Sequence, residues 1–411
     1  MKILSIETSC DETAISIVEA KGNIKNHQFK VLSNITLSQA KLHAKYGGVF
    51  PSLAKREHSR NLVPVLQKVL EQGFGKHKSQ TPNYRQITNS KLQKIKQILK
   101  REPELLEQFL EFIPTIKKPA IDKIAVTYGP GLEPALWVGI NFAKALSEVW
   151  STTKRIPVVP VNHMEGHIAS VLPLQNRGNS KSETNSKLKK KLEIRDSSLE
   201  FPAVALLISG GHTELVLVKE WGDYKILGQT RDDAVGEVFD KVARMLDLPY
   251  PGGPEISRLA DQARNLKPKI KNLINFPRPM INSPDLDFSF SGLKTAVLYH
   301  LQKYPAKTTE EKSLIAEEFE LAVVEIFLRK IKKAIEQSGA KTLIVAGGVS
   351  ANKFIRSEIE RKFGKEIEIL IPEFELSTDN ALMIAIAGYL KILRKSKTPK
   401  NIKAEGNLSF N

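Results

Sequence analysis

The sequence has almost no cysteine and no apolar run long enough to cross a membrane. Cys10 is the only thiol among 411 residues, which excludes an internal disulfide framework and fits a reducing compartment. The chain opens directly on the strand-like KILSIE, without the leader of a secreted protein. We therefore expect a soluble, cytoplasmic protein that does not contact membranes.

Acidic residues are also fewer than basic ones. The 62 lysines and arginines exceed the 45 acidic residues, and the net charge of +17 indicates a polyanionic partner. Much of this charge is local: residues 76–118 carry ten basic and four acidic side chains, and residues 175–199 carry seven and three. Both segments resemble insertions, for which a solvated surface is a commoner explanation than an RNA-binding arm.

The two inserted segments predict different structures. The first has helix-spaced apolar residues on both sides of Pro103, a residue typical of a helix start, and predicts a helical hairpin. The second, QNRGNSKSETNSKLKKKLEIRDSSL, is rich in Ser, Asn and Lys and predicts a flexible surface loop. The apolar positions of the hairpin are Leu92, Ile95, Ile98 and Leu99, then Leu105, Leu106, Phe109, Leu110 and Ile113.

The rest of the chain forms two similar halves. Residues 3–19, ILSIETSCDETAISIVE, and 204–219, VALLISGGHTELVLVK, both have the pattern strand, tight turn, strand, and alternating strands and helices follow each. This order predicts an α/β fold of two actin-like lobes, with mixed β-sheets flanked by helices and a nucleotide cleft between them, as in the actin, sugar-kinase and Hsp70 superfamily. We expect a first lobe over 1–172, a second lobe over 200–379, a helix over about 380–395 that packs back on the first lobe, and a basic tail over 396–411.

Three glycine turns suit a bound phosphate. They are Gly129-Pro130-Gly131, Gly210-Gly211-His212, and Gly347-Gly348 before Ser350 and Asn352. Such a turn leaves backbone N–H groups uncovered, and a following helix adds its positive end. Glycines serve equally for tight packing between a strand and a helix. The occurrence of three turns in one chain favours a nucleotide site.

The stretch VNHMEGHIAS places His163 and His167 four residues apart, on one face of a helix. The pair is suited to a metal ion, but a buried pair with ordinary hydrogen bonds is an equally good explanation of the spacing. A zinc protease of the H-E-x-x-H type needs a glutamate directly after the first histidine. Here that residue is Met164, and Glu165 points away from the pair, so the protease reading fails.

Nine ordered motifs resemble the bacterial TsaD family, tRNA N6-adenosine threonylcarbamoyltransferases. The resemblance covers nearly the whole chain except the two inserted segments and the basic tail. The motifs are IETSCDETAISIV, HAKYGGVFPSLAKREH, GPGLEPALWVG, NHMEGH, LLISGGHTELV, VGEVFDKVARMLDLPYPGGP, DFSFSGLKTAV, AGGVSANK and STDNALMIA.

This resemblance implies transfer of a threonylcarbamoyl group from threonylcarbamoyl-adenylate to N6 of adenosine 37, in tRNAs reading codons that start with adenine, with release of AMP. It implies a homologous TsaB-like partner and a TsaE-like ATPase. It also implies one divalent metal ion per subunit, Fe²⁺ with Zn²⁺ as the alternative, bound by His163, His167 and Asp379. The implied adenylate-binding residues are Ile208, Ser209, Gly210, Gly211, His212, Asp240, Gly253 and Asn352. Ser257 stands where some members carry an aspartate that contacts the ribose.

Several of these residues have ordinary structural explanations as well. Asp379 lies in STDN before an apolar helix, where an N-cap is expected. Asp11 and Glu12 lie in the first hairpin turn, where acids often only stabilise the turn, but we assign them as catalytic acids because this turn faces the phosphates in the superfamily. Nothing in the sequence supplies Cys10 with a base.

Two other functions remain open at this point. An ATP-dependent kinase or ATPase of the same superfamily would share the hairpins and glycine turns without needing the His, His, Asp set. A non-catalytic scaffold subunit would lack those ligands. The segment FSFSGLKTAV has no assigned role, and we expect its Phe288 and Phe290 in the core.

Overall fold

The computed structural model describes residues 1–75, 87–151, 155–172, 199–265, 274–396, 399 and 401–410. The chain forms two compact units. Unit 1 comprises Met1–Gln39, Phe50–Ser198 and Asp379–Ser409, and unit 2 comprises Ala40–Val49, Leu199–Thr378 and Phe410–Asn411. The basic loop expected over 175–199 lies, except for its last residue, outside the described residues.

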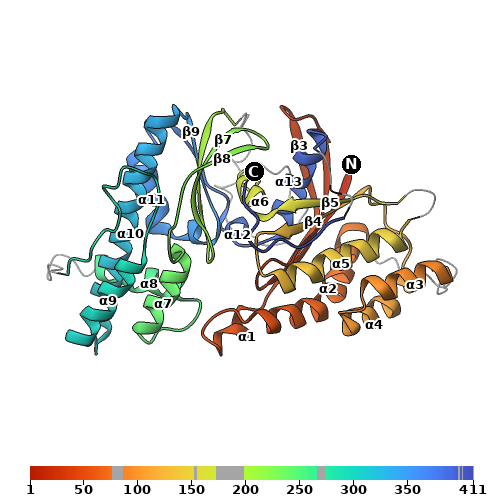
Figure 1. Ribbon diagram of the computed structural model, residues 1–411, viewed down its shortest axis with the longest axis horizontal. Helices are drawn as coiled ribbons and strands as arrows, with labels where there is room; N and C mark the ends of the chain where they lie inside the picture. The colour runs from red at the N-terminus through yellow and green to blue at the C-terminus, as the bar shows by residue number, and fades with distance from the viewer. Residues whose placement is uncertain are drawn as a thin grey trace. The chain divides into compact units, whose positions relative to one another are not determined.

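Unit 1 is built on a five-stranded sheet in the order β3-β2-β1-β4-β5 (Figure 1). The first hairpin of the sequence forms β1 and β2, which pair antiparallel, while β4 and β5 run parallel to β1. The sheet is therefore mixed, as predicted. Its strands are β1 (Lys2–Glu7), β2 (Glu12–Gly22), β3 (His27–Ser38), β4 (Lys123–Gly129) and β5 (Val158–Asn162).

The two faces of this sheet serve different purposes. Alternate residues of a strand point to opposite faces, so Leu4 and Ile6 share one face and Ser5 and Glu7 the other. Leu4 and Ile6 join the hydrophobic core formed with α2 (Pro51–Phe74) and α5 (Glu133–Val149). Ser5 instead donates a hydrogen bond to the Ala381 carbonyl, at the start of α13 (Ala381–Leu393). This second face, packed against α13 and the short α6 (His163–Ala169), is where the buried polar residues gather.

The first inserted segment ends in two helices fixed to unit 1. They are α3 (Asn89–Ile98) and α4 (Pro103–Phe112), followed by the 3₁₀ turn η2 (Ile113–Thr115). Pro103 occupies the start of α4. Ile95 and Phe109 are fully buried. The Phe109 ring packs edge-on against the Phe142 ring of α5, with 6.0 Å between the ring centres.

Unit 2 has a second five-stranded mixed sheet, in the order β10-β9-β6-β7-β8. Phe288 and Phe290 are fully buried and contact Phe327 in its core, which confirms that expectation. The strands are β6 (Ala203–Ile208), β7 (Thr213–Glu220), β8 (Asp223–Gln229), β9 (Thr342–Ala346) and β10 (Glu368–Leu370). The helices are α1 (Ala40–Ala44), α7 (Val235–Met245), α8 (Gly252–Asn265), α9 (Ser291–Lys303), α10 (Thr309–Ser338), η3 (Gly348–Ala351), α11 (Lys353–Phe363) and α12 (Phe374–Ser377).

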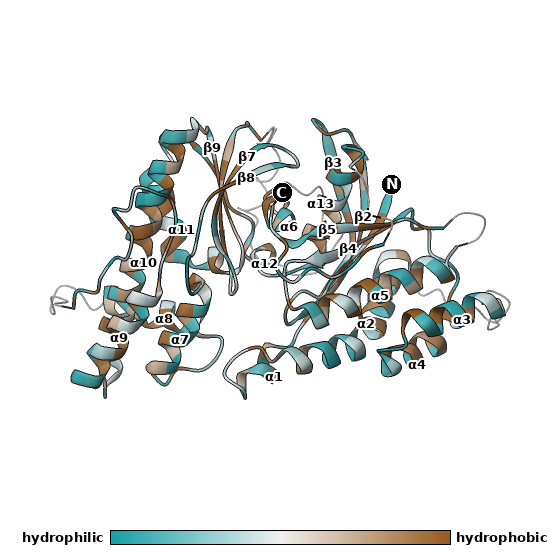
Figure 2. Ribbon diagram, viewed as in Figure 1, coloured by the Kyte–Doolittle hydropathy of each residue, from teal (hydrophilic) through white to brown (hydrophobic). Residues whose placement is uncertain are grey.

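The sheet of each unit thus starts with an antiparallel strand pair and continues with parallel strands that are joined by helices. The predicted fold class is confirmed in this respect. Figure 2 shows hydrophobic residues along the strands of both sheets, mixed with hydrophilic ones on the edge strand β3, and many hydrophilic residues on α3. Among the helices that the structure describes, none combines the length and apolarity needed to span a bilayer.

Candidate functional site

His163, His167 and Asp379 come together in unit 1. Asn162 caps α6 by accepting a hydrogen bond from Met164 N, which places the two histidines on the first turns of the helix. Asn380, and not Asp379, caps α13 by accepting from Met383 N. The Asp379 side chain is therefore available to approach the histidines.

The spacing of these three side chains suits a shared cation. Asp379 Oδ1 lies 3.3 Å from His163 Nε2 and 3.2 Å from His167 Nε2. Metal–ligand bonds of roughly 2.1 Å would place neighbouring ligand atoms about 3.0 Å apart at 90° and about 3.4 Å apart at 109°. Both distances from Asp379 Oδ1 fall in this range, and one ligand atom from each residue falls within 4.8 Å of the others.

His167 supports the metal interpretation. It is fully buried, and neither ring nitrogen has a hydrogen-bond partner within the described part of the chain. The 3.2 Å approach of Nε2 to Asp379 is close, but its geometry is not that of a hydrogen bond. A buried polar nitrogen without a partner is costly, and an ion shared with Asp379 would satisfy it.

The charges of the cluster are strongly coupled. Burial alone would lower the pKa of His163, but the nearby carboxylates of Asp379 and Glu7 outweigh it and raise this pKa well above its usual range. Burial lowers the pKa of His167, against an opposing effect of Asp379. Burial would raise the pKa of Asp379, yet the two histidines hold it well below its usual range. In the absence of an ion, a proton on His163 balances the Asp379 charge.

Glu7 orients His163 and was not singled out by the sequence analysis. Its Oε2 lies 3.1 Å from His163 Nδ1, which leaves Nε2 directed at the metal position. The carboxylate is fully buried and also accepts hydrogen bonds from Ser9 N and Thr127 Oγ1, both at 2.6 Å. Ser9 Oγ lies 3.3 Å from the same His163 nitrogen. The sequence signal for Glu7 was an acidic residue at the end of a strand, KILSIE, whose other residues are mostly apolar.

The acids of the first hairpin turn share the electrostatic environment of Asp379. Burial, with the charges of Asp11 and Asp379, raises the pKa of Glu12 well above its usual range. Burial and the same two acids raise the pKa of the Cys10 thiol. Cys10 therefore stays protonated near neutral pH and is a poor nucleophile.

A buried histidine holds this turn in place. His58 Nε2 lies 3.0 Å from the Cys10 carbonyl oxygen, and its Nδ1 lies 2.8 Å from Thr13 Oγ1. Glu12 Oε1 accepts a hydrogen bond from Ser38 at 3.1 Å. The position of the turn thus depends on α2, which carries His58.

Glu165 plays no part in the cluster. Its carboxylate pairs with Arg394 at 3.7 Å, beyond the end of α13. The structure therefore supports the rejection of a protease of the H-E-x-x-H type.

A second candidate site lies in unit 2, at the turn between β6 and β7. Ser209 N donates to the His212 carbonyl, and His212 N donates to Ser209 Oγ, which closes the turn. Two glycines pack directly on it: a Cβ on Gly236 would meet Ser209 O at 2.5 Å, and one on Gly347, whose φ is +94°, would meet Ile208 O even more closely. The turn is therefore held rigidly.

Other glycines around this turn are not explained by packing. An added Cβ on Gly210, Gly211, Gly253 or Gly348 would meet no atom within 4 Å, and none of these residues has a positive φ. Neither steric contact nor backbone conformation demands glycine there. Uncovered backbone N–H groups, accessible to an anionic ligand, provide a reason.

The remaining predicted ligands act partly as supports. Asp240 Oδ1 accepts a hydrogen bond from Gly252 N at 2.7 Å and so fixes the start of α8. Asn352 donates both amide hydrogens, to Ser257 Oγ at 2.7 Å and to Glu320 at 2.5 Å, and caps α11 through its oxygen. Asn352 and Ser257 therefore tie three helices together around Glu320.

The turn Gly129-Pro130-Gly131 is better explained by packing than by phosphate. A Cβ on Gly131 would lie 2.6 Å from Ser9 O, and one on Gly129 would clash with Glu405 O. Both glycines have φ above +140°. The close-packing alternative, and not a nucleotide, accounts for this turn.

Fold and site together define an α/β protein with two related mixed sheets, a His, His, Asp cluster in unit 1 that could hold a metal ion, and a rigid glycine turn in unit 2. A family model described as "TsaD: tRNA N6-adenosine threonylcarbamoyltransferase" matches residues 30–76, 96–179 and 188–386. A tRNA N6-adenosine threonylcarbamoyltransferase of Thermosipho africanus (strain TCF52B) is 38% identical over 411 residues, which cover 100% of both chains. The chain belongs to the TsaD family of tRNA N6-adenosine threonylcarbamoyltransferases. This membership favours the transferase over the kinase and scaffold alternatives.

Solved structures resemble the fold at low sequence identity. Full-length HypF in its phosphate- and nucleotide-bound form aligns with a TM-score of 0.50 and 10% identity, over 96% of this chain and 47% of that one. The activator of 2-hydroxyisocaproyl-CoA dehydratase from Clostridium difficile aligns over 98% and 100% of the two chains, with a TM-score of 0.43 and 12% identity. The likeness to HypF bears on the fold alone.

Proposed function

We propose that this transferase uses threonylcarbamoyl-adenylate as donor and adenosine 37 of tRNA as acceptor, and releases AMP. His163, His167 and Asp379 would hold one divalent ion, with Fe²⁺ preferred over Zn²⁺. Ile208, Ser209, Gly210, Gly211, His212, Asp240, Gly253 and Asn352 would form the adenylate site, directly or as supports.

The observation that carries the metal assignment is the convergence of two imidazole nitrogens on one carboxylate oxygen, at 3.3 and 3.2 Å, with His167 otherwise without a hydrogen-bond partner among the described residues. A set of three N and O ligands leaves coordination positions open for substrate oxygens. An ion bound there would supply Lewis acidity toward a phosphate or carbonyl oxygen. Such ligands fit Fe²⁺ and Zn²⁺ alike, so direct metal analysis must decide between them.

The predicted site residues of the two units would have separate tasks in the transfer. Glu7 keeps the His163 ring oriented through the 3.1 Å contact with Nδ1. The N–H groups of Gly210 and Gly211 would bind the negative charge of the adenylate and of the leaving AMP. Asp11 or Glu12 would accept the proton from the attacking N6 amine, and the raised pKa of Glu12 makes its carboxylate a stronger base.

The proposal needs no covalent enzyme intermediate. The adenylate already has a good leaving group, and the amine attacks the carbamoyl carbon while the bond to AMP breaks. A thiol kept protonated by burial, as at Cys10, fits a bystander role. The same unpaired thiol fits action in a reducing cytoplasm.

We further propose a TsaB-like homologous partner and a TsaE-like ATPase as components of the working enzyme. This part of the proposal rests on the family resemblance. It is tested by omitting each protein in turn from a complete reaction.

Metal analysis tests the centre. The purified, anaerobically loaded chain should bind one divalent ion, and His167→Ala or Asp379→Asn should bind none. His300→Ala is the matched control, because His300 lies on α9 of unit 2 and outside the cluster. Full metal content in both cluster variants would refute the assignment.

The complete assay contains threonylcarbamoyl-adenylate, unmodified tRNA and the two partner proteins, and measures modified nucleoside and AMP. We expect equal amounts of both products from the metal-loaded chain. Release of AMP without modified nucleoside, at rates unaffected by tRNA, would contradict the proposed transfer.

A further inference from the structure

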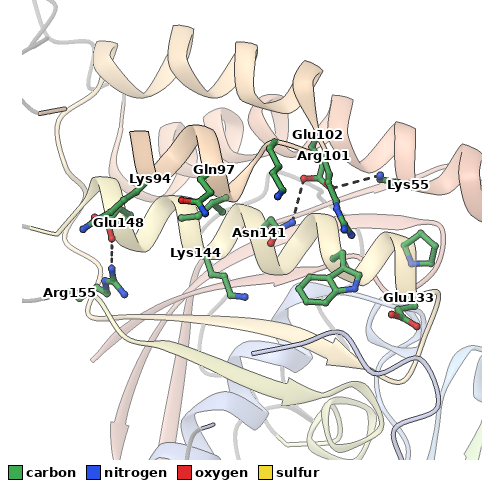
Figure 3. Close-up of a pocket in the computed structure, with 14 residues that line it drawn as sticks. Lys55, Lys94, Gln97, Arg101, Glu102, Glu133, Asn141, Lys144, Glu148 and Arg155 are labelled. Atoms are coloured by element: carbon green, nitrogen blue, oxygen red, sulfur yellow. Dashed lines mark hydrogen bonds and ion pairs between the residues drawn. The ribbon is translucent and has the colours of Figure 1, made fainter. Parts of the chain in front are cut away.

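A groove of about 820 Å³ runs along α5 in unit 1 (Figure 3). One wall comes from α3 and the turn between α3 and α4, and the floor comes from α5. The proposed chemistry uses none of its lining residues. Six of them are cationic, namely Lys55, Lys94, Lys100, Arg101, Lys144 and Arg155.

The groove is positively charged overall. Three acids, Glu102, Glu133 and Glu148, oppose the six cations, which leaves a net charge of +3. Glu148 alone balances both Lys94, at 3.1 Å, and Arg155, at 2.5 Å (Figure 3). An anion entering the groove would therefore find surplus positive charge at this end.

Three of the six groove cations form no ion pair among the described residues, and one of them, Lys144, instead donates to the Ile402 carbonyl at 2.8 Å. Lys100 and Arg101 are exposed, and neither forms an ion pair within 4.0 Å in the part of the chain that the structure describes. A lysine and an arginine side by side at a groove wall offer a point charge and a planar fork of donors, both suited to phosphate.

The wall that carries these cations is firmly attached. Lys91 of α3 donates to the carbonyls of Val149 and Ser151, at 3.2 and 2.5 Å, and Ile95 and Leu99 are fully buried beneath it. The groove is thus a preformed surface. The family model passes over residues 77–95, so part of this wall is additional to the family match.

The groove also has an aromatic residue and a useful length. Trp137 is partly exposed, with Lys144 Nζ 5.5 Å from the centre of its ring. The floor from Glu133 to Glu148 extends roughly 22 Å at the rise of an α-helix. An aromatic side chain among cations along an extended groove is typical of surfaces that follow a nucleic-acid backbone.

One end of the groove lies at the hairpin turn next to the metal centre. Leu132 N, directly before α5, donates to Ser9 O at 2.7 Å, and Ser9 Oγ lies 3.3 Å from His163 Nδ1. From this end the groove runs along α5, which packs on the opposite face of the sheet from α13. A bound polyanion would reach both the groove and the edge of the sheet at which the metal centre lies.

We propose that this groove binds the phosphate backbone of the tRNA, away from the base that is modified. The inference deepens the proposed function and rests on it, because it assigns a surface to the tRNA substrate. Contacts remote from the reacting atoms stabilise the bound substrate and the transition state alike, so they lower KM for tRNA without changing kcat.

The test compares two double variants of the full metal-loaded chain. Lys100→Ala with Arg101→Ala removes the two exposed groove cations that form no ion pair. Lys117→Ala with Lys118→Ala is the matched control, because these exposed lysines belong to the same inserted segment and do not line the groove. Binding of an unmodified tRNA transcript is measured by fluorescence anisotropy from 0.05 to 0.3 M salt, and KM and kcat are measured in the complete assay.

Each phosphate contact lowers the logarithm of the binding constant by roughly 0.7–0.9 per tenfold rise in salt. Losing two contacts should weaken tRNA binding roughly 25- to 60-fold at 0.1 M salt and reduce the salt slope by about 1.4–1.8. KM for tRNA should rise by a similar factor while kcat and metal content stay unchanged. Trp137 fluorescence should respond to tRNA, and Trp137→Phe should lose that response.

Three results would overturn the proposal. Unchanged tRNA binding in the groove variant would exclude phosphate contacts there. Equal loss in the control variant would show a general charge effect. Lower activity in the complete assay that is restored by excess TsaB-like protein, with tRNA binding intact, would make the groove a protein-docking surface. Failure of the metal centre is distinguished by its own readout, the metal content of the cluster variants.

Discussion

Replacing Glu7 by glutamine tests how the metal centre is organised. The change keeps the shape of the side chain and removes the negative charge that faces His163 Nδ1 at 3.1 Å. Carboxylates that orient a metal-binding histidine typically contribute 10- to 100-fold in metal affinity. We therefore expect the metal dissociation constant to rise by this factor, which corresponds to about 1.4–2.7 kcal/mol.

The same substitution should also cost stability. Glu7 accepts hydrogen bonds from Ser9 N and Thr127 Oγ1, whereas the glutamine amide can accept at only one of its two positions, so one of these buried donors loses its acceptor. A buried mismatch of this kind costs about 1–3 kcal/mol. Thermal unfolding of metal-free Glu7→Gln measures this loss of stability separately. The metal affinities of the variant and of the unaltered chain are then compared at a temperature where both are folded.

Competition with a chelator of known affinity provides the assay for the metal term. Glu165→Gln is the control, because Glu165 lies on the same helix as His163 but pairs with Arg394. Its metal affinity should match that of the unaltered chain. Undiminished metal affinity in folded Glu7→Gln, or an equal loss in Glu165→Gln, would refute the orienting role of Glu7.

Cys10→Ser should retain metal binding and turnover, because burial already keeps this thiol protonated; loss of turnover with metal and adenylate still bound would require a covalent step. Gly210→Ala should leave the free energy of unfolding within about 0.5 kcal/mol while weakening adenylate binding in calorimetry, since its Cβ enters open space. Gly347→Ala should instead destabilise by about 2 kcal/mol or more, because its φ is +94° and its Cβ would meet Ile208 O; comparable urea midpoints for the two glycine variants would contradict this. Burial raises the pKa of Glu214 to about 7, so the folded chain binds more protons than the unfolded chain above pH 4.5 and loses stability as the pH rises toward 7. Glu214→Gln should remove that loss, roughly 2 kcal/mol at pH 8 once partial exposure is allowed for, and an unchanged pH dependence of urea unfolding would disprove it.

The regular parts of the fold were readable from the sequence because each has a local signal. Residues 3–19 and 204–219 alternate apolar stretches around small polar turns, and they form the pairs β1–β2 and β6–β7. Pro103 marks the first residue of α4 for a similar reason, since the fixed φ of proline suits a helix start.

The metal cluster was readable only in part. The four-residue spacing of His163 and His167 follows from helix geometry, but Asp379 is more than 200 positions away and entered through the family resemblance. From the sequence, Asp379 was expected at the end of the second lobe. In the structure it belongs to unit 1. Contacts across such a separation depend on how α13 packs, which no local pattern encodes.

Glycines show why a motif alone does not identify a site. Gly131 and Gly210 both lie in turns that suit phosphate. A side chain at the first would collide with Ser9 O, while one at the second would meet open space. The difference between these two glycines depends on neighbouring residues that folding brings together. The groove along α5 depends on folding in the same way, because its wall and its floor come from separate parts of the sequence.

The return of the chain to unit 1 has a consequence for synthesis on the ribosome. Residues 379–409 are translated only after the whole of residues 199–378, yet α13 covers one face of the first sheet and Glu405 N bonds to Tyr128 O beside β4. A nascent chain therefore carries an unfinished amino-terminal core, and only two of the three residues of the His, His, Asp cluster, while the second unit is being made. Assembly of the candidate metal site is thereby postponed until translation has passed Asp379.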